Sequence, residues 1–328
     1  MEAYIDLPNL ISMIRSYDNP MYDDCKRMLK NYFHLNFNFS KSELLQNEVL
    51  MKWITTMCEG DQTANARKAC YMSEPFPERP LKSNVSKTFS KEQLSAVYLL
   101  NDDKIDSINN NGCMLFSKNG NEINTLSSLI GNDNYNFSKQ IDIHHLKSWT
   151  DLEPYLLPCT DIIIEDRYIF SSEELYESNL YKLISQLSKF CKSTKLNIVF
   201  FAQQDAKKPY VVSEIGKRLK SIVCSQTKAT PNITFVISNY KKDFHDRIIF
   251  TNYKTLFSGD SFNYFNSKNE VISEGDWICV NSLANIEYYQ NAMNFIGNMQ
   301  KIVDEVGRRS NTPNCGIIGD KISNYLRF

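Results

Sequence analysis

A histidine and an arginine stand two residues apart, at His245 and Arg247, where an apolar run typical of a β-strand begins. Side chains two apart on a strand point to the same face, so we expect the imidazole and the guanidinium to lie side by side. Such an imidazole can attack phosphorus, and a fixed cation beside it can hold phosphate oxygens. Gly259 lets the following turn approach a ligand, and Ser261 and Asn263 offer hydrogen bonds. The segment therefore predicts a site for a phosphate ester.

This segment resembles the half-site of the phospholipase D-like superfamily, which reads His-x-Lys, four residues, Asp, six residues, Gly-Ser and a nearby Asn. His245 and Arg247 take the first two places, and Asn252 takes the Asp place. Ser261 and Asn263 are each displaced by one from the commonest spacing. The resemblance implies a metal-independent phosphodiesterase without a cofactor. In such an enzyme, His245 would be the nucleophile and Arg247 would hold phosphate. Asn252, Ser261 and Asn263 would support them.

The resemblance covers roughly residues 155–265, and the sequence departs from the family pattern at two places. Arg247 replaces lysine, which keeps the charge but changes the geometry. Asn252 replaces aspartate and removes a carboxylate, so the imidazole needs another group to orient it. Active members use two histidines, and a homodimer would supply the second His245 by two-fold symmetry. We expect a nuclease-type domain that acts on or binds nucleic acid. The alternative is an inactive domain of the same fold that binds nucleic acid or a partner protein.

A second, weaker match occurs earlier in the chain, where His145 and Lys147 are followed by Asp151. The gap to Asp151 is one residue short and no Gly-Ser follows. We favour a polar turn before Trp149 over a second half-site.

Acidic residues end one predicted strand and offer a third class of function. Glu165 and Asp166 follow an apolar run that begins at Asp161, and the carboxyl ends of such strands host ligands in open α/β sheets. Carboxylates there could bind magnesium in a metal-dependent nuclease that uses Asp161, Glu165 and Asp166. The alternative is a charged, solvated strand end with Arg167.

Basic residues gather between the next strands and suggest a groove for a nucleic-acid backbone. Lys242, just before His245, is a further candidate phosphate ligand. The alternative is a solvated helix face. The cluster comprises Lys207, Lys208, Lys217, Arg218, Lys220, Lys241 and Lys242, with Tyr210 nearby.

Strand and helix patterns alternate from about residue 150 onward, which predicts an α/β domain with a mainly parallel sheet and crossover helices. The apolar runs are continuous rather than alternating, so both faces of the sheet should be covered. A long helix is expected from Asn285. The predicted strands span residues 161–165, 196–202, 232–238, 247–251 and 254–258, and the predicted helices begin near residues 171 and 211.

The first 75 residues show apolar positions at helical spacing and predict a helical region. Three prolines between residues 75 and 80 mark the expected boundary. We therefore expect a helical region at residues 1–80 and a phospholipase D-like α/β domain with a C-terminal helix at 81–328. Within that domain, residues 96–100 suggest a strand and residues 113–123 a hairpin turning at Asn-Gly.

Composition excludes several classes of protein. The 328 residues are 42% hydrophobic and 23% charged with a net charge of −1, which indicates a globular chain rather than a nonspecific coat for nucleic acid. The nine cysteines include no CxxC pair, which argues against structural zinc and predicts reduced thiols in the cytoplasm. No apolar run is long enough to span a membrane, and the first residues do not form a signal peptide.

Overall fold

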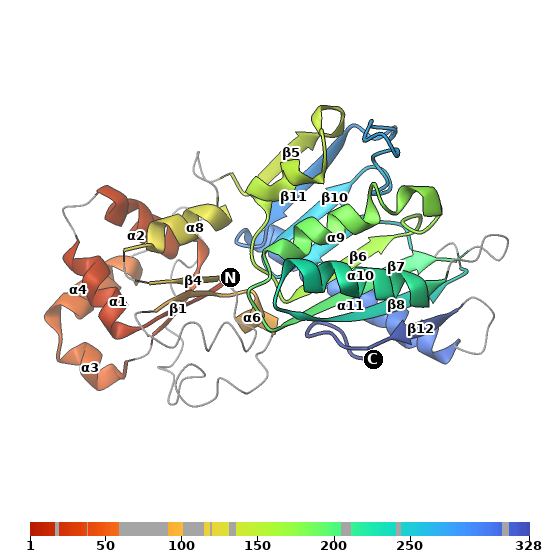
Figure 1. The fold of residues 1–328 in the computed structure, drawn as a ribbon. Helices are drawn as coiled ribbons and strands as arrows, with labels where there is room; N and C mark the ends of the chain where they lie inside the picture. Colours follow the sequence, from red (N-terminus) through yellow and green to blue (C-terminus); the bar gives the residue numbers. More distant parts are fainter. Residues whose placement is uncertain are drawn as a thin grey trace. The chain divides into compact units, whose positions relative to one another are not determined.

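The computed structural model describes residues 1–16, 20–37, 39–58, 91–100, 115–118, 120–130, 136–204, 211–240, 244–309 and 315–328. These residues form two compact units (Figure 1). Unit 1 is Met1–Phe137 with Leu283–Tyr289, and unit 2 is Ser138–Ser282 with Gln290–Phe328. The residues around the boundary expected near residue 80 lie outside the described residues, and the described residues between 91 and 130, expected in the second domain, belong to unit 1.

Unit 1 is a small α/β unit built on a parallel sheet of four strands in the order β2-β1-β3-β4. Asp6 follows the first strand and accepts a hydrogen bond from the Asn9 amide at 2.8 Å, which starts the first helix. The strands are β1 (Glu2–Ile5), β2 (His34–Phe37), β3 (Val97–Leu99) and β4 (Leu115–Ser117). The helices are α1 (Leu7–Arg15), α2 (Pro20–Tyr32), α3 (Lys41–Leu45), α4 (Glu48–Cys58), α6 (Lys91–Leu94) and α8 (Glu122–Ile130).

Two expectations for this region are wrong. The first 80 residues are not only helical, because β1 and β2 join the parallel sheet. Both strands have only four residues, so the helical periodicity around them dominates the sequence pattern. The hairpin expected at residues 113–123 does not form, since β4 pairs in parallel with β3 and the chain continues into helix α8. The strand expected at residues 96–100 is confirmed as β3.

Unit 2 contains a mixed sheet of eight strands in the order β12-β8-β7-β6-β9-β10-β11-β5. The central strands β6, β7 and β8 are parallel to one another, and each of the remaining pairings is antiparallel. The strands are β5 (Ser138–Asp142), β6 (Asp161–Asp166), β7 (Lys195–Gln203), β8 (Thr230–Ser238), β9 (Arg247–Thr251), β10 (Lys254–Ser258), β11 (Trp277–Ser282) and β12 (Gly316–Gly319). The 3₁₀-helices are η1 (Ile143–His145), η2 (Trp149–Tyr155) and η3 (Glu173–Leu175), and the α-helices are α9 (Leu180–Lys189), α10 (Val212–Gln226) and α11 (Ile286–Arg308).

The core of unit 2 explains why its central strands read as continuous apolar runs. Alternate residues such as Ile162, Ile198 and Phe200 pack with the apolar stripes of α9 and α10. The intervening residues are also buried, and Phe250 meets the ring of Tyr325 at 4.8 Å between centroids. The sheet is thus covered on both faces, as predicted.

The general α/β class is therefore confirmed, and the strands expected from residue 161 to residue 258 are present. The sheet of unit 2 is mixed rather than mainly parallel, because antiparallel strands extend it on both sides of β6–β8. The long helix expected from Asn285 is α11. No helix in the described part of the chain is long and apolar enough to cross a membrane.

Candidate functional site

The carboxyl end of β6 is the point where the predicted histidine and arginine enter the fold. Strand β9 runs antiparallel to β6 and places Arg247 opposite Asp166. Glu165 fixes the residues just before β9, because its Oε1 accepts hydrogen bonds from the backbone amides of His245 at 2.9 Å and Asp246 at 3.2 Å. The His245 side chain is exposed and Arg247 is half-buried. The antiparallel register thus brings both residues beside two buried carboxyl groups.

Ser261 and Asn263 reach the same end of the sheet from the loop after β10. The Ser261 hydroxyl donates to Asp166 Oδ2 at 2.8 Å, and the Asn263 amide donates to the Tyr168 carbonyl at 2.9 Å. The Asn263 amide also donates to Ser261 Oγ at 3.2 Å. Four of the predicted site residues, His245, Arg247, Ser261 and Asn263, therefore gather at one edge.

Asn252 does not join them. It is fully buried, and its Oδ1 accepts from the backbone amides of Thr160 at 2.9 Å and Asp161 at 3.2 Å. The whole of β9 separates it from Arg247, and five residues at about 3.4 Å each put the two roughly 17 Å apart. Asn252 therefore fixes the amino end of β6 and does not orient the His245 imidazole.

An exposed tyrosine completes the edge and was missed by the sequence analysis. The Arg167 guanidinium lies 5.2 Å and the Arg247 guanidinium 5.8 Å from the centre of the Tyr168 ring, which is 42% exposed. Arg167 Nε also donates to Gln203 Oε1 at the end of β7. Each guanidinium thus makes a cation–π contact with the same ring, and such contacts are stabilising. We call Arg167, Tyr168 and Arg247 the arginine–tyrosine edge. The Arg-Tyr pair directly after an apolar strand was the signal available in the sequence.

Three buried polar atoms at this edge have no hydrogen-bond partner in the described part of the chain. They are Glu165 Oε2, Arg247 Nε and Asn263 Oδ1. Folded proteins pair nearly all such atoms, so each unpaired one calls for a water, an ion or a ligand. Both a donor and acceptors are left open here.

Burial raises the pKa of Glu165 to about 7, although the amides that donate to its Oε1 act in the opposite direction. Burial also raises the pKa of Asp166 to about 6, against three hydrogen bonds and the nearby charge of Arg247. Both carboxyl groups therefore take up protons between neutral and mildly acidic pH. The uptake lowers the negative charge beside Arg247 and favours an anionic ligand.

Asp161, the third acid of the metal-nuclease alternative, lies at the opposite end of β6. Its carboxylate accepts from the Asn324 amide nitrogen at 2.9 Å, the Asn324 side chain at 2.6 Å and the Asn197 side chain at 3.2 Å. The acids of that alternative are therefore not brought together. Across the described ranges, no three His, Cys, Asp or Glu side chains form a group that could hold a metal ion.

The remaining candidates lie elsewhere. The Lys147 backbone amide donates to Asp151 at 2.7 Å and His145 pairs with Asp142, which gives the polar turn before the buried Trp149 that we favoured. Lys242, Lys241, Lys207, Lys208 and Tyr210 lie outside the described residues. Arg218 and Lys220 pair with Glu177 and Asp320 on one side of unit 2.

Comparisons with known proteins add little. No family model matches the chain, and no curated protein matches it. Among solved structures, one similar chain is TrmBL2, described as an archaeal chromatin protein with a novel mode of DNA binding. It is 8% identical, the match covers 50% of this chain and 53% of TrmBL2, and the TM-score is 0.26. The match spans about half of TrmBL2, and a likeness of this extent identifies neither fold nor function.

Proposed function

We propose that unit 2 is a phospholipase D-like domain that binds the phosphodiester backbone of single-stranded nucleic acid at the arginine–tyrosine edge. One observation carries the proposal: two guanidinium groups share one exposed tyrosine ring at the carboxyl end of a parallel strand. Proteins that bind single strands combine cations for the backbone with aromatic rings on which bases stack. The exposed His245 side chain lies beside this edge and adds a further donor.

Binding is better supported than cleavage. The Ser261 hydroxyl already donates to the Asp166 carboxyl group, so this predicted phosphate ligand is engaged in the free protein. Asn252 is too distant to orient the imidazole. These features match an inactive member of the proposed family more closely than an efficient enzyme.

The proposal is tested by fluorescence anisotropy with a labelled single strand of about 12 nucleotides, a length within the range that such sites cover. Arg247→Ala should weaken binding about tenfold, since a charge-assisted contact contributes about 1.5 kcal/mol or more. Arg27→Ala is the control, because it removes an exposed arginine from unit 1. Equal affinity of the two variants would overturn the proposal.

Cleavage is the second candidate, because the exposed His245 lies two residues from Arg247 as the mechanism requires. An imidazole nitrogen would form a bond to phosphorus while the bond to the leaving oxygen breaks. That oxygen needs a proton from an acid, which His245 of a second copy would supply. Incubation with labelled strands tests this candidate. His245→Ala should abolish cleavage and retain binding, and EDTA should have no effect. If the strands stay intact after incubation with the wild-type protein, cleavage is excluded and binding remains as the proposed function.

A further inference from the structure

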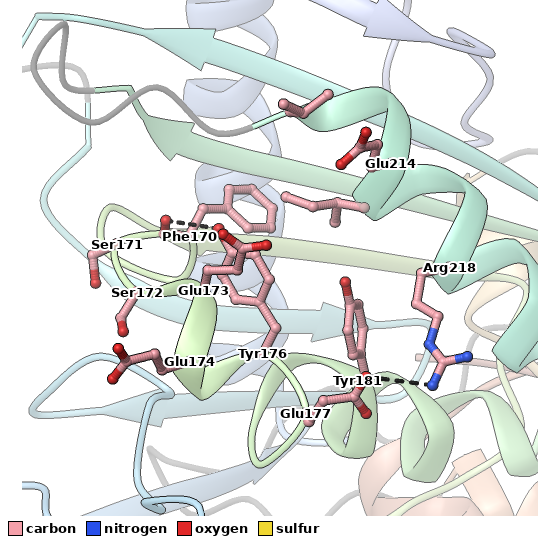
Figure 2. Close-up of a pocket in the computed structure, with 12 residues that line it drawn as sticks. Phe170, Ser171, Ser172, Glu173, Glu174, Tyr176, Glu177, Tyr181, Glu214 and Arg218 are labelled. Carbon is pink, nitrogen blue, oxygen red and sulfur yellow. Dashed lines mark hydrogen bonds and ion pairs between the residues drawn. The ribbon is translucent and has the colours of Figure 1, made fainter.

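A cavity of about 840 Å³ opens in unit 2, and its lining residues include none of those proposed to bind nucleic acid. Figure 2 shows its walls, which come from the turn after β6, from η3 with the start of α9, and from the start of α10. Its volume lies within the range of roughly 300–1,000 Å³ that is typical of small-molecule sites.

The described residues that line the cavity carry a net negative charge. They supply four carboxylates against one guanidinium, Arg218, which pairs with Glu177 at 3.3 Å. The other three, Glu173, Glu174 and Glu214, form no ion pair within the described residues. Figure 2 shows Glu214 extending from α10 and Glu173 from η3, so carboxylates stand on two different walls.

Aromatic rings form the rest of the lining. Tyr176 and Tyr181 meet edge to face at 6.1 Å, and the Tyr176 hydroxyl donates to the Phe170 carbonyl at 3.0 Å. Burial raises the pKa of Tyr176 to about 12, and the charge of Glu173 acts in the same direction. Rings beside carboxylates are the surroundings that proteins offer to organic cations.

Arg218 provides an internal example of the occupant that the cavity fits. Its guanidinium lies 5.8 Å from the centre of the Tyr181 ring and uses Glu177 as counterion. The chain thus already places one cation between a tyrosine face and a glutamate. The remaining space offers the same chemistry, with three further carboxylates and no second cation among the described residues that line it.

We propose that this cavity binds a linear polyamine, in which two or more ammonium groups are separated by methylene chains. Ammonium groups would pair with Glu214 on one wall and with Glu173 and Glu174 on the other. Phe170 and Ile215 supply apolar surface for the methylene groups between them.

The test is isothermal titration calorimetry of the full chain with spermidine at low salt. Glu173→Gln and Glu214→Gln should each weaken binding about fivefold, the loss expected for one exposed ion pair of about 1 kcal/mol. Glu274→Gln is the control, because it neutralises an exposed glutamate outside the cavity. Tyr181→Ala should weaken binding further, whereas Tyr181→Phe should retain it.

Equal affinity of Glu214→Gln and Glu274→Gln would overturn the proposal, as would Mg²⁺ displacing spermidine at equal concentration. An arginine-rich peptide that binds where spermidine does not would also overturn it and would indicate a protein partner. The Arg247→Ala variant should bind spermidine normally, so failure of the nucleic-acid proposal leaves this one intact.

Discussion

Two buried carboxyl groups of strand β6, Asp161 near its amino end and Glu165 near its carboxyl end, differ in how completely they are hydrogen-bonded. At the amino end, Asp161 is fully buried and accepts hydrogen bonds from Thr160, Asn197, Ser323 and Asn324. At the carboxyl end, Glu165 is equally hidden, but only its Oε1 is paired and its Oε2 has no partner among the described residues. This sequence is thus able to saturate a buried carboxylate where the fold depends on it. We infer that the open atoms near Glu165 serve a ligand.

The largest effect on stability is expected at Asp161, because both of its carboxylate oxygens accept hydrogen bonds. Asp161→Ala should lower the free energy of unfolding by about 3–5 kcal/mol, because the buried donors of Asn324 and its neighbours lose their acceptor. Urea denaturation measures this loss. Asp276→Ala removes an exposed aspartate of the same unit and should change the free energy of unfolding by less than about 0.5 kcal/mol. A loss below about 1 kcal/mol for Asp161→Ala would remove the contrast between the two ends.

Glu165, at the carboxyl end of β6, should dominate the pH dependence of stability. The pKa of Glu165 is raised by burial to about 7, so between its ordinary value and pH 7 the folded state binds more protons than the unfolded state. Stability therefore falls as the pH rises through this window, by about 3 kcal/mol for one such group. Urea denaturation at pH 5 and pH 8 measures the change, and Glu165→Gln should reduce it. Glu274→Gln should leave the difference unchanged, and a Glu165→Gln variant with the wild-type difference would contradict the assignment.

A smaller effect is expected from the tyrosine of the arginine–tyrosine edge. Tyr168→Ala should weaken binding of a single strand by roughly 1–3 kcal/mol, the contribution of one stacked base. Tyr168→Phe keeps the ring and should bind within about twofold of the wild type, by the same argument. Anisotropy titrations measure both variants. A loss in Tyr168→Phe equal to that in Tyr168→Ala would show that the hydroxyl group matters rather than stacking.

His245→Ala should have the smallest effect on stability. The side chain is exposed, and the contact that fixes this segment runs from its backbone amide to Glu165. Surface substitutions of this kind usually change the free energy of unfolding by less than about 0.5 kcal/mol. A larger loss in urea denaturation would indicate that the imidazole is part of the packed structure rather than available to a ligand.

The fold was predictable where the sequence pattern was long and continuous. Strands β6, β7 and β8 are covered on both faces, so their sequences are continuous apolar runs. Such runs are recognisable in the sequence as buried strands. The edge strand β5, with the polar sequence Ser138–Asp142, and the four-residue β12 carry no comparable pattern. Their pairing depends on contacts with β11 and β8 that are distant in sequence.

The site was predictable only in part, for a similar reason. The spacing of His245 and Arg247 follows from the geometry of one strand, and Ser261 and Asn263 follow a short connection. The neighbours of Arg247 depend instead on the register between β9 and β6, which places Asp166 opposite it. The burial that raises the pKa of Glu165 likewise arises from tertiary packing, and a spacing rule contains no information about it.

The salt dependence of single-strand binding tests the central inference most directly. Each cation that contacts a phosphate contributes about −0.7 to the slope of log K against log salt. The variant with both Arg167→Ala and Arg247→Ala should therefore have a slope shallower than wild type by about 1.4, whereas Arg27→Ala should keep the wild-type slope. An unchanged slope in the double variant would mean that Arg167 and Arg247 do not contact a phosphate backbone.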